Sequence, residues 1–249
     1  MNRTLIYPIG LTDACFYAAQ SLKQIGFPLT DHPQPEVTHI LMDIPSFRDR
    51  RSETQLANLL SMLPPYVTVI GGNLDHPLLS EYKKLDLLKD ADYLAQNAFI
   101  TADCALRVAA PYLKTTFADS PALILGWGRI GKCLAKLLKA LDCPVAIAAR
   151  KESDRAMIHA LNYTAVDYPA LPKDLSRYQI LFNTVPAPIL SEETLSHCKH
   201  CVKIELASQN GLAGEDIRIA RGLPGAYAPA TSGKLIASTF YRLWKEESP

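Results

Sequence analysis

The chain has 249 residues, of which 48% are hydrophobic and 20% charged, with a formal net charge of +1. This composition supports a sizeable core and excludes a disordered chain, and the balanced charge gives no electrostatic reason to expect nucleic acid or a membrane as partner. The N-terminus lacks a signal-peptide pattern and no run is long enough to span a bilayer. Six scattered cysteines indicate reduced thiols, so we expect a cytoplasmic protein.

The first part of the chain alternates short β-rich runs with helical patterns. Strands are predicted in RTLIYPI, VTHILMD and YVTVIGG, and a helix over residues 13–26. A second helix is predicted in SETQLANLLSML with Ser52 as its cap, and a third over residues 97–113, bent or ended near Pro111. This alternation is typical of parallel α/β folds.

A second α/β unit is predicted to begin at Pro121. Its strands are expected in ALILG, VAIAAR, YTAV, QILFNTV, CVKIEL and GAYA, followed by a helix over residues 232–244. We therefore expect two Rossmann-like domains with doubly wound parallel sheets, a cleft between them and helices that cross from one to the other. Residues 120–225 form the predicted NAD(P)-binding domain. Residues 1–119 form the substrate-side domain, completed by a C-terminal helix within 226–249.

The apolar run ALIL leads directly into GWGRIGK, a glycine-rich turn that opens a helix. In this context Gly126 allows a tight turn, Gly128 lets a pyrophosphate approach the backbone, and Gly131 lets helix and strand pack closely. The phosphates would lie at the helix N-terminus, where N–H groups and the helix dipole favour anions. The residues expected to contact a dinucleotide here are Gly126, Trp127, Gly128, Arg129, Ile130 and Gly131.

The end of the second strand of this unit bears on the choice of dinucleotide. About 20 residues past the turn, NAD enzymes place an acid on the ribose 2′-OH. Here Arg150 and Lys151 occupy that region. An arginine can pair with a 2′-phosphate, so the sequence favours NADP, with NAD possible. The alternative is that both side chains are ordinary solvated charges.

Two later strand ends complete the predicted cofactor site. The fourth strand is followed by NTVP, which suits a loop lining a nicotinamide, although the same residues could form a rigid turn. The end of the fifth strand adds another expected contact. The residues assigned to the cofactor at these two ends are Asn183, Thr184, Val185, Pro186 and Ala207.

These motifs occur in a characteristic order. The GxGRxG turn is followed by Ala149-Arg150, by NTVP, by the strand end ELAS and by GLPGAYAPATSGKLIA. Together, from about Asn97 to the C-terminus, they resemble the A-type subunit of dipicolinate synthase, an enzyme of spore-forming bacteria. The resemblance implies a cytosolic oxidation of dihydrodipicolinate to dipicolinate with NAD(P). It also implies a partner, the flavoprotein-like B-type subunit of that enzyme.

The same resemblance suggests residues for the substrate. An Asn…Thr…Glu pattern of that family appears here as Asn97, Thr101 and Asp103, with aspartate in place of glutamate. A dicarboxylate substrate is expected against the neutral donors Asn97, Thr101, Ser208 and Gln209. Asp103 is the candidate catalytic base, if burial raises its pKa. The alternative is that Asp103 is an acid in the first turn of a helix, favoured by the dipole alone.

Two other functions remain open. A D-2-hydroxyacid dehydrogenase shares the two-domain plan and the GxGRIG turn, but needs a histidine late in the nucleotide domain. The six histidines are His32, His39, His76, His159, His197 and His200, and none lies beyond Cys201. A non-catalytic NADP-binding regulatory or scaffold protein is the second alternative, because the N-terminal domain looks shortened and PIGLTD replaces the Gly-Gly-Asp loop of the family.

The segment HCKHC is the one candidate metal cluster. Its cysteines and histidines could bind zinc, but no second pair at finger-like spacing follows. We therefore expect no metal, and a loop or helix end before the strand CVKIEL. A homodimer is expected because relatives of this architecture usually dimerise through the nucleotide domain.

Overall fold

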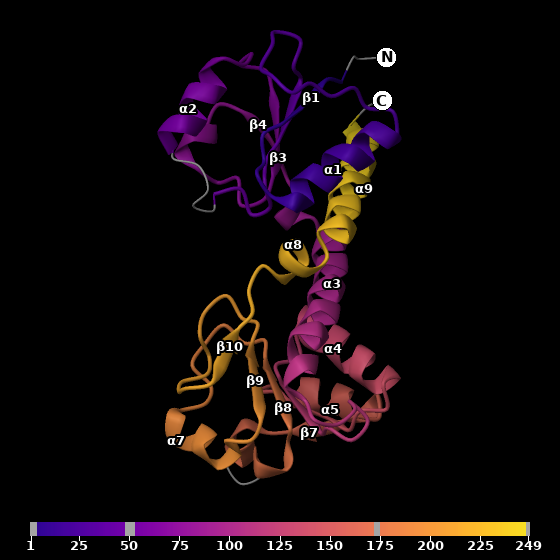
Figure 1. The fold of residues 1–249 in the computed structure, drawn as a ribbon, viewed down its shortest axis with the longest axis vertical. Helices are drawn as coiled ribbons and strands as arrows, with labels where there is room; N and C mark the ends of the chain where they lie inside the picture. The colour runs from indigo at the N-terminus through magenta and orange to yellow at the C-terminus, as the bar shows by residue number, and fades with distance from the viewer. Residues whose placement is uncertain (1–3, 48–52, 172–174, 248–249) are drawn as a thin grey trace. The chain divides into compact units, whose positions relative to one another are not determined.

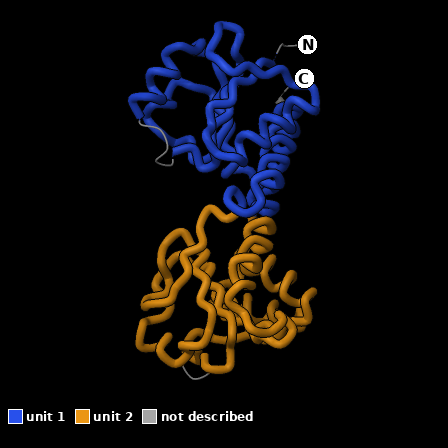
Figure 2. Tube along the Cα trace, viewed as in Figure 1, with its two compact units in different colours: residues 1–97, 224–249 blue, residues 98–223 orange. Residues whose placement is uncertain are grey.

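The computed structural model describes residues 4–47, 53–171 and 175–247. It divides into two compact units, unit 1 (residues 1–97 and 224–249) and unit 2 (residues 98–223), shown in two colours in Figure 2. The division falls within the helix α3 (Ala91–Ala109). The domain boundary expected at residue 120 lies just before the first strand of unit 2 and stays a prediction.

Unit 1 contains a parallel sheet whose strands follow one another in the order β1-β2-β3-β4 (Figure 1). Three of these strands lie within the predicted runs. Ser52, the predicted helix cap, lies outside the described residues. The elements are β1 (Ile6–Pro8), α1 (Asp13–Gln24), β2 (His39–Leu41), α2 (Glu53–Ser61), β3 (Thr68–Gly71) and β4 (Lys83–Asp86).

A short segment on the other side of β1 makes this sheet doubly wound. Leu29 forms an isolated parallel bridge with Ile6, and the Thr30 N–H donates to the Ile6 carbonyl at 3.0 Å. With this one-residue strand counted, the spatial order becomes 2-1-3-4-5, the flavodoxin-like order. The direction of winding therefore reverses between Leu29 and β2, with β1 at the switch point.

The helix α9 (Pro229–Glu247) returns to unit 1 from the far end of the chain and lies against α1 (Figure 1). A Cβ on Gly233 would meet the Ala18 backbone nitrogen at 2.6 Å, so glycine permits this close approach. Further along, the fully buried Phe240 ring lies 5.3 Å from that of Phe27. The Trp244 indole donates to the Thr4 hydroxyl at 3.1 Å. Unit 1 is thus assembled from both ends of the chain.

Unit 2 contains a six-stranded parallel sheet in the order β10-β9-β8-β5-β6-β7. Numbered within the unit, this is the 3-2-1-4-5-6 order of dinucleotide-binding folds read from the other edge. The central strands β5 and β8 are fully buried, which explains their continuous apolar runs. The elements are β5 (Ala122–Leu125), α4 (Arg129–Ala140), β6 (Val145–Ala148), α5 (Glu152–Ala160), β7 (Thr164–Val166), β8 (Ile180–Asn183), α7 (Glu192–Leu195), β9 (Val202–Glu205) and β10 (Ile217–Ile219).

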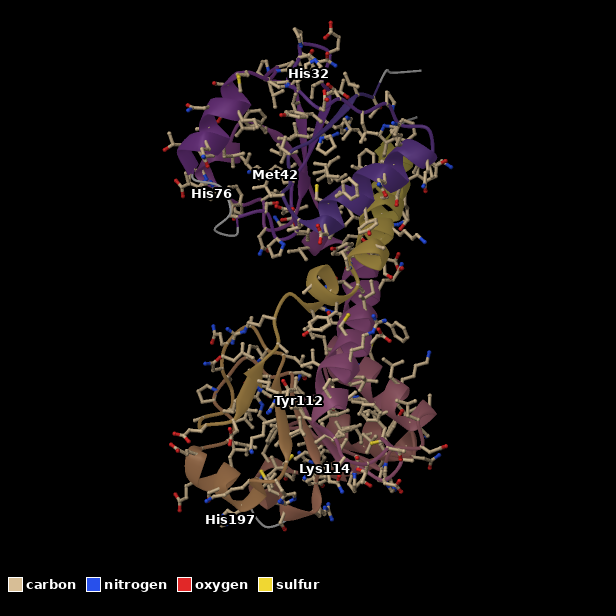
Figure 3. The ribbon with its side chains drawn as sticks, in the orientation of Figure 1. His32, Met42, His76, Tyr112, Lys114 and His197 are labelled. Atoms are coloured by element: carbon tan, nitrogen blue, oxygen red, sulfur yellow. The ribbon has the colours of Figure 1, made fainter. Side chains whose placement is uncertain are left out.

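The sixth strand of this sheet was predicted in the wrong place. GAYA belongs to the helix α8 (Leu223–Tyr227), and the strand is β10. A proline in the first helical turn, here Pro224, is tolerated because its missing N–H would have no partner there. β10 is only partly buried, and the Arg218 guanidinium lies 3.6 Å from the centre of the Tyr112 ring, which Figure 3 labels.

The two long helices both begin earlier than predicted. α3 begins at Ala91 rather than Asn97, because the Asp90 carboxylate accepts from the Tyr93 N–H at 2.7 Å and supports the N-terminus. It ends before Pro111, as predicted, and continues as a short 3-10 turn. α9 begins at Pro229 instead of Ser232. Over the described ranges, no helix has the length and apolarity needed to cross a membrane.

Candidate functional site: the nucleotide-binding edge of unit 2

Four sequence motifs meet at the carboxyl edge of the unit 2 sheet. The last residues of neighbouring strands are in register: Leu125 with Ala148, Leu125 with Asn183, and Asn183 with Glu205. The glycine turn, Arg150, the NTVP loop and the ELAS segment therefore all leave the sheet at one level. The carboxyl edge at a switch point is where open α/β sheets bind ligands.

The three glycines of the turn have the properties that a pyrophosphate cradle requires. Gly126 has φ of 102°, and a Cβ there would meet the Thr184 hydroxyl at 2.6 Å. A Cβ on Gly131 would collide with the carbonyl oxygen of Gly126. At Gly128 a Cβ would meet no atom within 4 Å, so the backbone is open for a ligand to approach. These residues fit a dinucleotide phosphate group.

The helix α4 begins immediately after this cradle. Gly128 is its N-cap residue and, with no side chain, cannot accept from the first-turn N–H groups, which have no partner within a helix. Arg129 is exposed at the first helical position. The Trp127 ring is partly buried, 6.2 Å from the Tyr163 ring and 5.6 Å from the Lys132 ammonium. The N-terminus of α4 therefore offers N–H donors and positive charge to an anion.

Arg150 lies two residues beyond β6 and is exposed. Its carbonyl accepts from the Arg155 guanidinium at 2.7 Å, and the same guanidinium contacts the Asp167 carboxylate at 3.1 Å. Burial raises the pKa of the Tyr168 phenol, and the positive charge of Arg150 offsets part of that rise. Lys151 is the N-cap residue of α5. Arg155 thus fixes the backbone that carries the two predicted 2′-phosphate ligands.

The NTVP loop is a rigid turn built by its own first residue. The fully buried Asn183 side chain accepts from the Val185 N–H at 3.1 Å and donates to the Val185 carbonyl at 3.1 Å. The Thr184 hydroxyl donates to the Leu125 carbonyl at 2.8 Å, which joins the loop to the glycine turn. The Asn183 amide faces the protein interior, so the loop offers its backbone and Pro186, which is exposed, to a ligand.

The segment after β9 holds the remaining predicted contacts. Ala207 is buried, whereas Ser208 and Gln209 are exposed. Sequence reasoning missed Glu205, a fully buried carboxylate that accepts from the Asn183 amide at 2.8 Å. A charged residue inside the apolar run CVKIEL was the available signal, because charged side chains are almost never fully buried without partners.

The three candidate residues on α3 are not at its start. Asn97 is partly buried and Thr101, one turn later, is buried. Asp103 lies in the middle of the helix, so the explanation that it is a first-turn acid is wrong: the helix begins twelve residues earlier, at Ala91. Its carboxylate lies 2.6 Å from the Arg107 guanidinium, and its side chain is 43% exposed. The catalytic and substrate assignments stay predictions.

The HCKHC segment lies at the opposite edge of the sheet. It precedes β9, and Figure 3 shows His197 beside α7. Cys198 and Cys201 are buried, and a hydrogen bond from Cys201 lowers the pKa of Cys198. Across the described residues no three His, Cys, Asp or Glu side chains are grouped so as to hold a metal. The segment is a 3-10 turn followed by a short loop before a strand, as predicted.

A hollow of about 1000 Å³ also lies at this opposite edge, where β5, β6 and β7 begin. Among its cations, Lys139 donates to the Leu161 carbonyl at 3.2 Å and lies 4.7 Å from the Tyr163 ring, and Arg177 donates to the Tyr178 hydroxyl at 2.8 Å. Lys139 is in the last turn of α4, where a cation stabilises the helix dipole. These contacts account for the positive charge without a ligand.

Comparison with known proteins agrees with this geometry. Residues 85–204 match the NAD-binding domain of D-isomer-specific 2-hydroxyacid dehydrogenases. The A-type subunit of dipicolinate synthase from Bacillus subtilis (strain 168) is 27% identical over an alignment 175 residues long, which covers 66% of this chain and 58% of that protein. The matched stretch thus spans less than two thirds of the relative.

Two solved structures of such subunits have the same fold. The A chain of dipicolinate synthase from Bacillus subtilis superposes with a TM-score of 0.80 at 20% identity, covering 99% of this chain and 97% of that one. The corresponding chain from Bacillus halodurans gives a TM-score of 0.78 at 20% identity, covering 97% and 98%.

Residues 85–204 therefore resemble an NAD-binding domain of the dehydrogenase type, and the chain as a whole has the two-sheet Rossmann-like α/β fold. The resemblance to the A-type subunit of dipicolinate synthase that its motifs indicate is confirmed.

Proposed function

We propose that this protein is an NAD(P)-dependent oxidoreductase that oxidises dihydrodipicolinate to dipicolinate. The observation that carries the proposal is the glycine cradle at the carboxyl edge of unit 2, with the other motifs of the resemblance leaving the same edge. The Bacillus subtilis relative supports the substrate, because that protein is one of the subunits of a dipicolinate synthase.

The proposed reaction requires little covalent chemistry from the protein itself. The dihydropyridine ring loses a hydride and a proton, and the product gains aromatic stabilisation. A bound oxidised nicotinamide cofactor supplies the hydride acceptor. The residues of this chain have to bind two carboxylates and hold the ring in position. Asn97, Thr101, Ser208 and Gln209 are the proposed neutral donors, and Asp103 is the proposed acceptor of the proton.

We propose NADP as the preferred cofactor. Arg150 follows the strand next to the glycine turn, where the ribose 2′ position is expected, and Lys151 adds a second positive charge. Arg150→Ala should weaken NADPH binding by about tenfold or more, since a charged contact is worth about 1.5–3 kcal/mol, and should leave NADH nearly unchanged. Calorimetry measures both, with the exposed Lys199→Ala as control. Equal losses for both cofactors would contradict the assignment.

The substrate and base are tested in one assay. Purified protein with dihydrodipicolinate and NADP should produce NADPH, measured by absorbance, and Asp103→Asn should abolish most of the turnover. Asp92→Asn, a matched change on the same helix, should not. Turnover that survives Asp103→Asn at the wild-type rate would remove Asp103 from the mechanism. NADP binding without any turnover would favour the regulatory or scaffold function. Turnover of D-2-hydroxy acids in place of dihydrodipicolinate would favour a D-2-hydroxyacid dehydrogenase.

The proposed assembly has two parts. We expect a homodimer, and a complex with the B-type subunit of a dipicolinate synthase. Light scattering of the purified chain, alone and mixed with a candidate B-type partner, measures both. A monomer mass that does not change on mixing would contradict both parts.

A further inference from the structure

Glu205 is the last residue of β9, and its carboxylate is fully buried. Oε1 accepts from the Asn183 amide at 2.8 Å and from the Ala207 N–H at 3.1 Å. Oε2 accepts from the same amide at 3.0 Å, and from the N–H groups of Gly211 and Leu212 at 2.9 and 3.1 Å. One side chain thus collects hydrogen bonds from three N–H groups of the loop after β9 and from Asn183, the last residue of β8.

These contacts hold two loops against each other. Asn183 shapes the NTVP turn, so the carboxylate fixes that turn through the Asn183 amide. Gly211 lies so close that a Cβ would meet the Val185 carbonyl at 2.9 Å and the Ala187 carbonyl at 2.7 Å. On the outer side, the Arg221 guanidinium donates to the Ala207 carbonyl at 2.8 Å. Ser208 and Gln209 lie on the segment held between these points.

The charge of Glu205 matters because the contacts that it makes are all with N–H donors. A buried carboxylate is costly unless such donors compensate for lost hydration, and here they do. A glutamine would turn its NH₂ group toward one set of donors and leave them unsatisfied. The carboxylate therefore specifies one arrangement of the two loops. A residue needed only for packing would not require two carboxylate oxygens that accept all of these hydrogen bonds.

We infer that Glu205 is a positioning residue that fixes the nicotinamide end of the dinucleotide site. This inference rests on the proposed function. A dinucleotide lies across the switch point, so its adenosine half belongs to the β6 side and its other half to the β8 and β9 side. Glu205 holds only the loops of the second side. Its loss should affect the nicotinamide half and spare the adenosine half.

The test compares two ligands by calorimetry: NADP⁺, which spans the whole site, and 2′,5′-ADP, which spans only the adenosine half. For Glu205→Gln, NADP⁺ should bind about tenfold more weakly, because the loops must be ordered on binding. Binding of 2′,5′-ADP should stay within about twofold of wild type. Glu205→Asp keeps the charge with a shorter reach and should lie in between. Glu215→Gln, an exposed change, is the control and should match wild type.

Each outcome has a defined meaning. Unchanged NADP⁺ binding in both variants would overturn the inference and leave the proposed function intact. Equal losses for both ligands, with thermal unfolding unchanged, would also overturn it, because the effect would not be local. If neither variant folds, Glu205 belongs to the fold as a whole and the inference fails. If wild-type protein binds neither ligand, the proposed function itself fails, and the inference with it.

Discussion

The two units contain the same strand–turn–helix element. In unit 1 a side chain of the protein fills the turn before the helix, whereas in unit 2 the turn is open. In unit 1, β1 leads through Gly10 into α1, and in unit 2, β5 leads through Gly126 into α4. Each helix has 12 residues, and each strand lies at the switch point of its sheet. A Cβ on Gly10 would meet the Cys15 sulfur at 2.5 Å, so this turn is as tight as its counterpart.

The difference is in what occupies the turn. In unit 1 the Asp43 carboxylate accepts from the N–H groups of Leu11 and Thr12 at 2.8 and 2.9 Å, and from the Thr12 hydroxyl at 2.6 Å. The chain thus supplies its own anion to this turn. In unit 2 the cap of α4 is Gly128, with no side-chain hydrogen bond and open space above it. The same element is closed in one unit and open in the other, so the fold alone does not define a site.

The largest expected effect is on the open turn. Gly131→Ala should weaken NADP⁺ binding by about 100-fold, because a Cβ there collides with the Gly126 carbonyl and costs about 2–3 kcal/mol in displaced backbone. Calorimetry and thermal unfolding measure the two effects. Gly128→Ala is the matched variant: its Cβ enters open space, so stability should hold while binding still falls. Undiminished binding in both variants would mean that the dinucleotide lies elsewhere.

The closed turn should respond in the opposite way. Asp43→Ala should lower the free energy of unfolding by about 2–3 kcal/mol, because it removes hydrogen bonds to a charged acceptor. NADP⁺ binding should stay within about twofold of wild type, because the change lies in unit 1. Denaturant unfolding gives the first value and calorimetry the second. The exposed Asp75→Ala should change neither. A large loss of NADP⁺ affinity would show that the closed turn takes part in binding.

The smallest effect concerns an ion pair of unit 1. The Arg242 guanidinium lies 2.7 Å from the Asp90 carboxylate. Burial alone would raise the pKa of Asp90, but the hydrogen bonds from Arg242 and from the Tyr93 N–H outweigh it and lower that pKa. The pair therefore stabilises unit 1 above the ordinary aspartate pKa of about 4, and this contribution is lost as the pH falls through the lowered value.

Arg242→Met should consequently cost about 1 kcal/mol at neutral pH, since the arginine side chain is 37% exposed. The difference from wild type should shrink toward acid pH. Thermal unfolding at a series of pH values measures it, with Lys245→Met on the same helix as control. A difference that does not vary with pH would mean that Arg242 acts through packing rather than charge.

Local patterns predicted most of the fold. The buried strands β5 and β8 are almost entirely apolar, so composition alone indicates them. β4 has a single apolar residue and β10 has only three residues in all. Both strands are only partly buried, and their pairing depends on neighbours that a local pattern does not contain. The same limit explains the start of α3, where Asp90, rather than apolar periodicity, sets the first turn.

The residues of the candidate site differ in the same way: those with partners nearby in the sequence could be predicted, and those with distant partners could not. The glycine turn was predictable because its function is set by neighbours within a few residues. The role of Glu205 was not, because its partner Asn183 is 22 residues away, and the Asp43 contact with Leu11 spans 32. The ion pair of Asp103 with Arg107 is local, because the two residues lie four apart within the helix predicted over residues 97–113.

The position of α9 has a consequence for synthesis on the ribosome. α9 covers buried residues of α1, among them Ala18 and Leu22, and its own Phe240 lies against Phe27. Unit 2 is encoded entirely before α9, so its sheet can form while the apolar face of unit 1 is still uncovered. Nascent chains therefore pass through a stage in which unit 2 can be folded while unit 1, although synthesised first, still lacks α9. During that interval the uncovered face of α1 is a target for chaperones.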